Sequence, residues 1–117
     1  MKSRSHYLGI TAVTLLALAL FVLPQSSSAA DNPAATVVIK IDNFSFAPQT
    51  VTVPAGTQVT WTNQDDIPHT IVSDDKTTFK SPALDTDERF SFTFTKAGTY
   101  EYFCSIHPKM TARIVVQ

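Results

Sequence analysis

The chain has 117 residues, of which 44% are apolar and 16% charged, and its formal net charge is -1 at pH 7. These values are typical of one small globular domain and exclude a disordered chain or a multidomain protein. The near-neutral charge balance also argues against a nucleic-acid binder, because such proteins neutralise phosphates with clustered lysines and arginines.

The first thirty residues have the layout of a signal peptide. Lys2 and Arg4 precede an apolar centre at residues 8–23, which is shorter than the roughly 20 residues needed to span a bilayer. Small side chains at residues 28–30 suit a signal peptidase, so we expect cleavage before Asp31 and no membrane span in the processed chain. The predicted location is the periplasm, and an uncleaved amino-terminal anchor is the alternative.

Strands with a period of two are expected after a short disordered lead-in at residues 31–36. Apolar side chains alternate with others along the first two of these strands. Pro, Ala and Gly at residues 54–56 then predict a tight turn between two antiparallel neighbours. The predicted strands of this part are residues 37–41, 50–53 and 58–63.

The same period returns after residues 74–87, which form the least regular stretch. Phe90, Phe92 and Phe94 lie on one face of a predicted strand, and the turn at residues 96–98 again suggests an antiparallel hairpin. The predicted strands of this part are residues 89–95, 99–103 and 111–116.

Seven or eight short strands and no helical period predict an all-β fold. We expect a Greek-key antiparallel β-sandwich that occupies residues 37–117. Trp61 and the phenylalanines are expected to fill the core between the two sheets, and we assign them no chemistry.

Removal of the first thirty residues leaves one cysteine, two histidines and one methionine. Cys104, His107 and Met110 follow one another at three-residue intervals between two predicted strands. A thiolate, an imidazole and a thioether are soft or borderline ligands that favour copper. His69 can supply the fourth ligand if the sandwich brings its loop alongside. Two histidines, one cysteine and a weak axial methionine make the donor set of a blue-copper site, so we predict one type 1 copper ion and one-electron transfer.

Other kinds of site fit the residues less well. A structural zinc site usually needs four cysteine or histidine ligands, and a c-type haem needs a second cysteine. A catalytic cysteine with a histidine partner would leave Met110 without a role, and no helix terminus is predicted that would activate the thiol. A module that stores or delivers copper stays open as the alternative to an electron carrier, because the ligands would be the same.

The sequence resembles the cupredoxins, and among them most closely the amicyanin branch. The resemblance covers nearly all of residues 37–116 and includes the short interval between His107 and Met110. It implies an eight-stranded sandwich with copper near one end and His107 at the surface. The shared motifs are residues 44–48 (FSFAP), 53–57 (VPAGT), 59–63 (VTWTN), 68–70 (PHT) and 97–104 (AGTYEYFC).

Two residues depart from the usual pattern of that family. Thr70 stands where asparagine usually follows the first histidine, so the bracing of the two ligand loops has to come from a hydroxyl. Ile106 stands where proline often precedes the second histidine, which restores a backbone N–H near the sulfur of Cys104. A further donor to that sulfur would favour Cu(I), so we expect Ile106→Pro to lower the midpoint potential.

The exposed edge of His107 is expected to be the electron port, within a docking patch formed by Pro68, Ile106 and Pro108. The expected partners are a redox donor and a redox acceptor, such as a dehydrogenase, a cytochrome or an oxidase, which meet a monomer through a small interface. Seven acids either steer a basic partner or simply form a solvated face. They are Asp65, Asp66, Asp74, Asp75, Asp85, Asp87 and Glu88.

Overall fold

The computed structural model describes residues 1–3, 9, 19, 21–22 and 35–117. The predicted signal peptide lies largely outside these residues, as do the predicted cleavage site and most of the lead-in at 31–36. The described residues include no helix with the length and apolar character of a membrane span.

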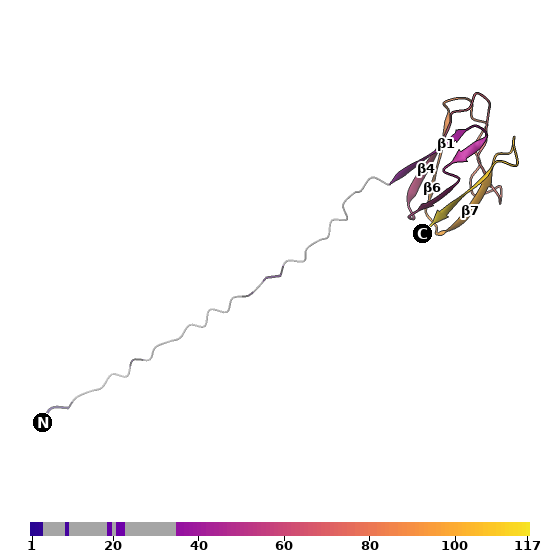
Figure 1. Cartoon of the computed structure of the whole chain (residues 1–117). Coiled ribbons are helices and arrows are strands. Elements are labelled where there is room, and N and C mark those ends of the chain that lie inside the picture. The colour runs from indigo at the N-terminus through magenta and orange to yellow at the C-terminus, as the bar shows by residue number, and fades with distance from the viewer. Residues whose placement is uncertain (4–8, 10–18, 20, 23–34) are drawn as a thin grey trace. The chain divides into compact units, whose positions relative to one another are not determined.

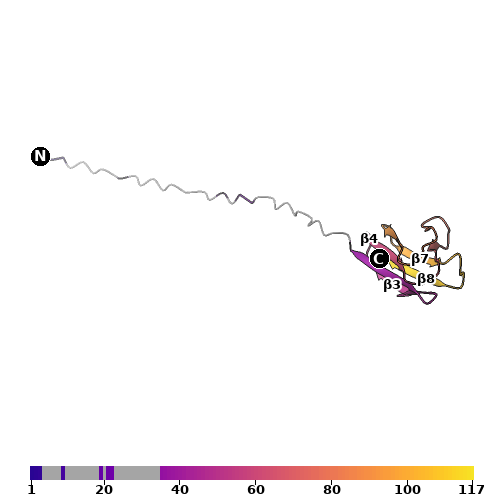
Figure 2. The ribbon, with the colours of Figure 1, turned by 90° about the horizontal axis from the view of Figure 1, so that it is seen from above.

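Within residues 35–117, eight strands form two sheets of four, which confirms the predicted all-β sandwich. One sheet has the order β2-β1-β4-β6 (Figure 1), and the other has the order β3-β8-β7-β5, of which Figure 2 shows β3, β8 and β7. The strands are β1 (Thr36–Asp42), β2 (Ser45–Ala47), β3 (Thr50–Val53), β4 (Thr57–Asn63), β5 (Val72–Ser73), β6 (Arg89–Phe94), β7 (Gly98–Phe103) and β8 (Thr111–Val116).

The sheets are mixed, so the prediction of a purely antiparallel sandwich is wrong in this respect. β1 pairs with β4 in parallel, and β3 pairs with β8 in parallel. Both predicted hairpins are also wrong, because β3 and β4 lie in different sheets, as do β6 and β7. At the first turn, the N–H of Ala55 donates to Gln117 and that of Gly56 to Phe94. A turn signal shows that the chain changes direction, but it does not show that the flanking strands pair.

The apolar side chains at every second position of the strands fill the space between the sheets, as predicted. Ile39 and Ile41 of β1 and Val59 and Trp61 of β4 are buried, whereas Val38 is exposed. The Trp61 indole N–H donates to the hydroxyl of Tyr102 on the opposite sheet, 3.2 Å away. This bond satisfies two polar groups inside the core and ties the two sheets together.

The irregular segment between β5 and β6 holds one side of the functional site in place. His69 and Leu84 exchange both main-chain hydrogen bonds, His69 N–H to Leu84 O at 3.1 Å and Leu84 N–H to His69 O at 2.8 Å. The backbone of the first histidine is therefore fixed by a segment that has no strand of its own.

Candidate metal centre

The four predicted ligands come from two loops that follow β4 and β7. His69 lies between β4 and β5, whereas Cys104, His107 and Met110 lie between β7 and β8. The second loop closes on itself, because the N–H of Cys104 donates to Met110 O at 3.0 Å and that of Met110 to His107 O at 2.9 Å. The three-residue spacing seen in the sequence is thus the spacing of a tight, hydrogen-bonded turn.

Three of these side chains converge. The Cys104 Sγ lies 3.7 Å from the Nδ1 of His69 and 3.8 Å from the Nδ1 of His107. The ligand atoms of the three residues lie within 4.8 Å of one another, with Cys104 and His69 fully buried and His107 half-buried. Met110 is 6% exposed, and its carbonyl accepts the N–H of Cys104. A buried thiolate flanked by two imidazole nitrogens fits copper by the chemistry of its donors.

The surroundings of Cys104 favour the thiolate, which is the form that binds metals. Burial by itself raises the pKa of the thiol, but the donors around the sulfur outweigh it and lower the pKa to about 6. The Thr70 N–H lies 3.4 Å from Sγ, and both histidines and the His107 N–H act in the same direction. The lowered pKa therefore favours the negatively charged thiolate, the form that binds a cation, already in the metal-free protein.

Thr70 braces the two ligand loops through its hydroxyl, as the sequence suggested it could. Its Oγ1 accepts the N–H of Ser105 at 2.7 Å and shares a second hydrogen bond with the Ser105 hydroxyl at 2.7 Å. It also lies 3.7 Å from the Cys104 Sγ. The Thr70 hydroxyl thus connects the loop of His69 to the loop of Cys104 across 35 positions of the sequence.

We expect Thr70→Val to lower the free energy of unfolding of the metal-free protein by about 0.5–1.5 kcal/mol, because it removes the partly buried hydrogen bonds of the Thr70 hydroxyl to Ser105. Urea unfolding followed by circular dichroism measures this loss. Thr70→Ser keeps the hydroxyl and serves as the control, with a loss of less than about half that size. Equal losses in the two variants would show that the hydroxyl braces nothing.

The residues of the predicted docking patch lie at the surface around His107. Ile106 is 46% exposed, and Pro68 and Pro108 are exposed as well. The expectation that the N–H of Ile106 is a donor to the Cys104 sulfur is wrong, because among residues 35–117 it makes no hydrogen bond to Sγ. The main-chain groups that act on the sulfur are those of Thr70 and His107.

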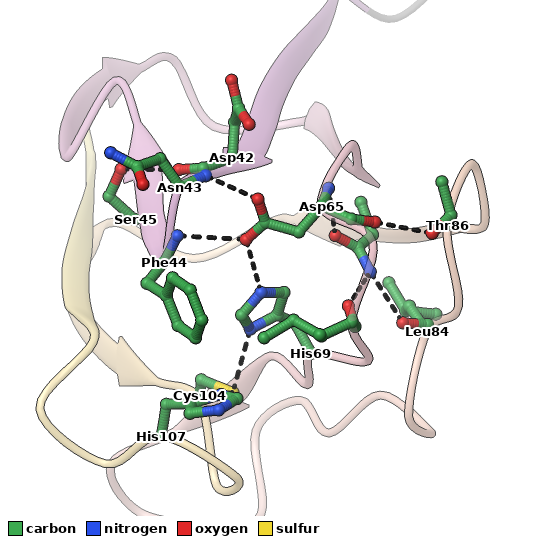
Figure 3. A network of polar contacts seen from close by, with 12 residues as sticks. Asp42, Asn43, Phe44, Ser45, Asp65, His69, Leu84, Thr86, Cys104 and His107 are labelled. Carbon is green, nitrogen blue, oxygen red and sulfur yellow. Dashed lines mark hydrogen bonds and ion pairs between the residues drawn. The ribbon is translucent and has the colours of Figure 1, made fainter.

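Asp65 is a site residue that the sequence analysis missed. We expected it to steer a partner or to belong to a solvated face, but it is only 9% exposed. Its carboxylate accepts a hydrogen bond from the Nε2 of His69 at 2.7 Å. Figure 3 shows the ring of His69 between Asp65 and Cys104. Both ring nitrogens of this histidine are therefore engaged, one by the carboxylate and the other by the donor cluster.

Phe44 is a second residue that the sequence analysis missed, because it was expected in the core. It is 54% exposed and its ring lies edge-on to two ligand rings, 5.1 Å from that of His107 and 5.7 Å from that of His69. The reason is its place in the two-residue turn between β1 and β2, beyond the end of the sandwich core. β2 was not predicted from the sequence, so no signal for this turn was available.

Known proteins share this fold. The cupredoxin-like domain family matches residues 12–116, so the chain belongs to that family. The chain is 35% identical to amicyanin of Paracoccus versutus over 96 residues, which are 77% of this chain and 71% of that protein. It is 38% identical over 84 residues to chloroplastic plastocyanin of Tetradesmus obliquus, covering 62% of this chain and 58% of that protein.

Solved structures of known proteins superpose on this chain. A mutant of amicyanin with Cu(I) superposes with a TM-score of 0.65 at 30% identity, covering 70% of this chain and 82% of the amicyanin. A purple cupredoxin from Nitrosopumilus maritimus superposes with a TM-score of 0.62 at 36% identity, covering 71% of this chain and 99% of that one. The resemblance drawn from the sequence motifs is thereby confirmed.

Proposed function

We propose that this chain is a type 1 copper protein that carries one electron at a time between redox partners and catalyses no reaction of its own. The observation that carries the proposal is the convergence of the Cys104 Sγ with the Nδ1 atoms of His69 and His107 in a cupredoxin fold. Relatives named amicyanin and plastocyanin support it. Met110, buried in the same loop as Cys104 and His107, is the proposed weak axial ligand.

Two of the proposed ligands keep the geometry of the site fixed, and a third exposes an edge through which an electron can pass. When bound, copper supplies the Cu(I)/Cu(II) couple. His69 and Cys104 are fully buried and held by hydrogen bonds, so their positions change little when the charge of the site changes. His107 alone of the four is half-exposed, and we propose that its edge is the electron port.

The surface around His107 is the proposed docking patch. Ile106, Pro68 and Pro108 offer apolar contact without burying a charge, which suits a small, short-lived interface. We propose a monomer that meets a redox donor and a redox acceptor in the periplasm after loss of residues 1–30. Expression of the full chain for export, followed by intact-mass measurement, tests the processing: we expect an amino terminus at Asp31.

Spectroscopy tests the function directly. The exported protein is purified, loaded with Cu(II), and its visible and electron paramagnetic resonance spectra are compared with those of Cys104→Ala. We expect an intense blue thiolate-to-copper band that a mild reductant bleaches reversibly and that the variant lacks. A colourless protein, or weak copper bands that survive in Cys104→Ala, would show that the ligands do not form a type 1 site.

Copper storage or delivery would use the same ligands but would need them to exchange readily. Burial of both Cys104 and His69 argues against rapid exchange. The two functions differ in rates, so the measurements are electron self-exchange by NMR line broadening and copper transfer to a chelator. Fast self-exchange with slow transfer supports the electron carrier, whereas slow self-exchange with fast transfer supports delivery.

Ile106→Pro tests the proposed effect of this residue on the potential. Proline removes the N–H of residue 106 and fixes its φ. Among residues 35–117 that N–H makes no hydrogen bond to the Cys104 Sγ, so we now expect the midpoint potential of Ile106→Pro to stay close to that of the wild type. Voltammetry of the variant beside Ile106→Ala, which keeps the N–H, measures the shift. An unchanged potential would assign the stabilisation of the sulfur to Thr70 and His107 alone, whereas a clearly lower potential only in Ile106→Pro would show that the N–H of residue 106 contributes.

A further inference from the structure

One carboxylate near the proposed copper site accepts three hydrogen bonds. The Oδ1 of Asp65 accepts the N–H of Asn43 at 2.6 Å. Its Oδ2 accepts the N–H of Phe44 at 3.0 Å and faces the Nε2 of His69 at 2.7 Å. A carboxylate with so little contact with water is stable only when such donors replace its hydration. Burial raises the pKa of Asp65, but these donors lower it overall, so the side chain is a carboxylate at neutral pH.

Two of the donors belong to a turn with an unusual backbone. Asn43 and Phe44 connect β1 to β2, and their φ angles are +50° and +57°. Asparagine tolerates this left-handed region, but a bulky phenylalanine rarely adopts it. Both N–H groups point to the carboxylate of a residue more than twenty positions away. Asp65 therefore stabilises the turn that places the Phe44 ring against the two ligand histidines.

The third donor is the ring of a proposed copper ligand. A carboxylate can only accept, so the Nε2 of His69 carries the hydrogen and its Nδ1 keeps the lone pair. That Nδ1 is the atom 3.7 Å from the Cys104 Sγ. The main chain of His69 is already fixed by Leu84, which leaves ring orientation and tautomer as the properties that a side-chain contact has to set.

We infer that Asp65 is a positioning residue, whose carboxylate holds His69 in the Nε2–H tautomer with Nδ1 turned to the metal and joins that ligand to the β1–β2 turn. The role toward copper rests on the proposed function, whereas the choice of tautomer belongs to the metal-free protein. A hydrogen bond from a ligand histidine to a carboxylate increases the donor strength of the imidazole. It therefore stabilises Cu(II) more than Cu(I), which lowers the midpoint potential.

A merely structural role for Asp65 predicts something different. If Asp65 only anchored the turn, its loss would reduce stability but would leave the tautomer and the potential unchanged. If only its charge mattered, a neighbouring acid would act equally. Asp66 is the matched control, because it is the next residue, carries the same charge and is exposed.

The first measurement uses the full chain expressed for export and purified without metal. Two-bond nitrogen–hydrogen NMR correlations of ¹⁵N-labelled histidine, in mildly alkaline buffer, report the tautomer of each ring. We expect His69 to be the Nε2–H tautomer in the wild type and in Asp66→Asn. In Asp65→Asn the amide can donate to Nε2, so we expect a substantial fraction of the Nδ1–H form. A wild-type His69 with hydrogen on Nδ1 would overturn the inference even if the variants failed to fold.

The second measurement uses the copper-loaded proteins. We expect Asp65→Asn to lower the affinity for copper by about 10–100-fold and to raise the midpoint potential, whereas Asp66→Asn changes both far less. Equal shifts in the two variants would overturn the inference in favour of a general charge effect. If the wild type shows no blue band, the proposed function fails, but the tautomer result still decides whether Asp65 positions His69.

Discussion

Replacing Trp61 by alanine is expected to lower the free energy of unfolding of the metal-free protein by about 3–5 kcal/mol. The side chain is fully buried, and its ring centroid lies 5.6–6.4 Å from those of four other aromatic rings. Alanine would leave a large cavity at the centre of the sandwich. It would also deprive the buried Tyr102 hydroxyl of the indole donor that links the sheets.

The loss is large for a domain of this size, since small domains are stable by only about 5–15 kcal/mol. Urea unfolding followed by far-ultraviolet circular dichroism measures it, because the variant lacks the chain's one tryptophan. Trp61→Phe serves as the control that keeps most of the ring but loses the N–H, and its expected cost is about 1–3 kcal/mol. A loss below about 1 kcal/mol for Trp61→Ala would mean that the aromatic cluster does not hold the two sheets together.

Removal of copper should lower the melting temperature by about 15–30 °C. A ligand present at about a thousand times its dissociation constant stabilises the folded state by about 4 kcal/mol, and each kcal/mol shifts the midpoint of a domain of this size by about 4–8 °C. The physical reason is that the donors meet only in the folded chain, where His69 and Cys104 come together from positions 35 residues apart. Differential scanning calorimetry of the metal-free and the loaded protein measures the shift.

The control for this prediction is Cys104→Ala, which should melt at nearly the same temperature with and without copper. A similar shift in the variant would mean that the stabilising copper binds elsewhere. A shift of less than about 4 °C in the wild type would mean that the donor cluster closes poorly around the metal.

Much of the fold could be predicted from local patterns, but strand pairing could not. Alternation identified the strands that contain Ile39, Trp61 and Tyr102, because a half-buried strand needs an apolar side chain at every second position. The alternation of apolar and polar side chains along a strand is the same, however, whichever strand it pairs with. The parallel pairs β1·β4 and β3·β8 depend on long-range packing, which no short stretch of sequence encodes.

The candidate site was likewise predictable only in part. The ligands were predictable because copper requires particular atoms, and few residues between positions 31 and 117 supply them. Asp65 and Phe44 are common residue types whose roles depend on what they touch. A buried aspartate cannot be told from a solvated one until the β1–β2 turn is placed above it.

The complete burial of Cys104 has a consequence for handling the protein. Because the chain has one cysteine, an alkylating reagent has a single point of attack, which stays shielded until the loops of Thr70 and His107 separate. The rate of alkylation in the metal-free protein therefore measures how often that end of the molecule opens. The free energy of this opening lies between that of a small local fluctuation and that of global unfolding. Disulfide-linked dimers in a purified sample would in turn identify molecules that had opened during storage.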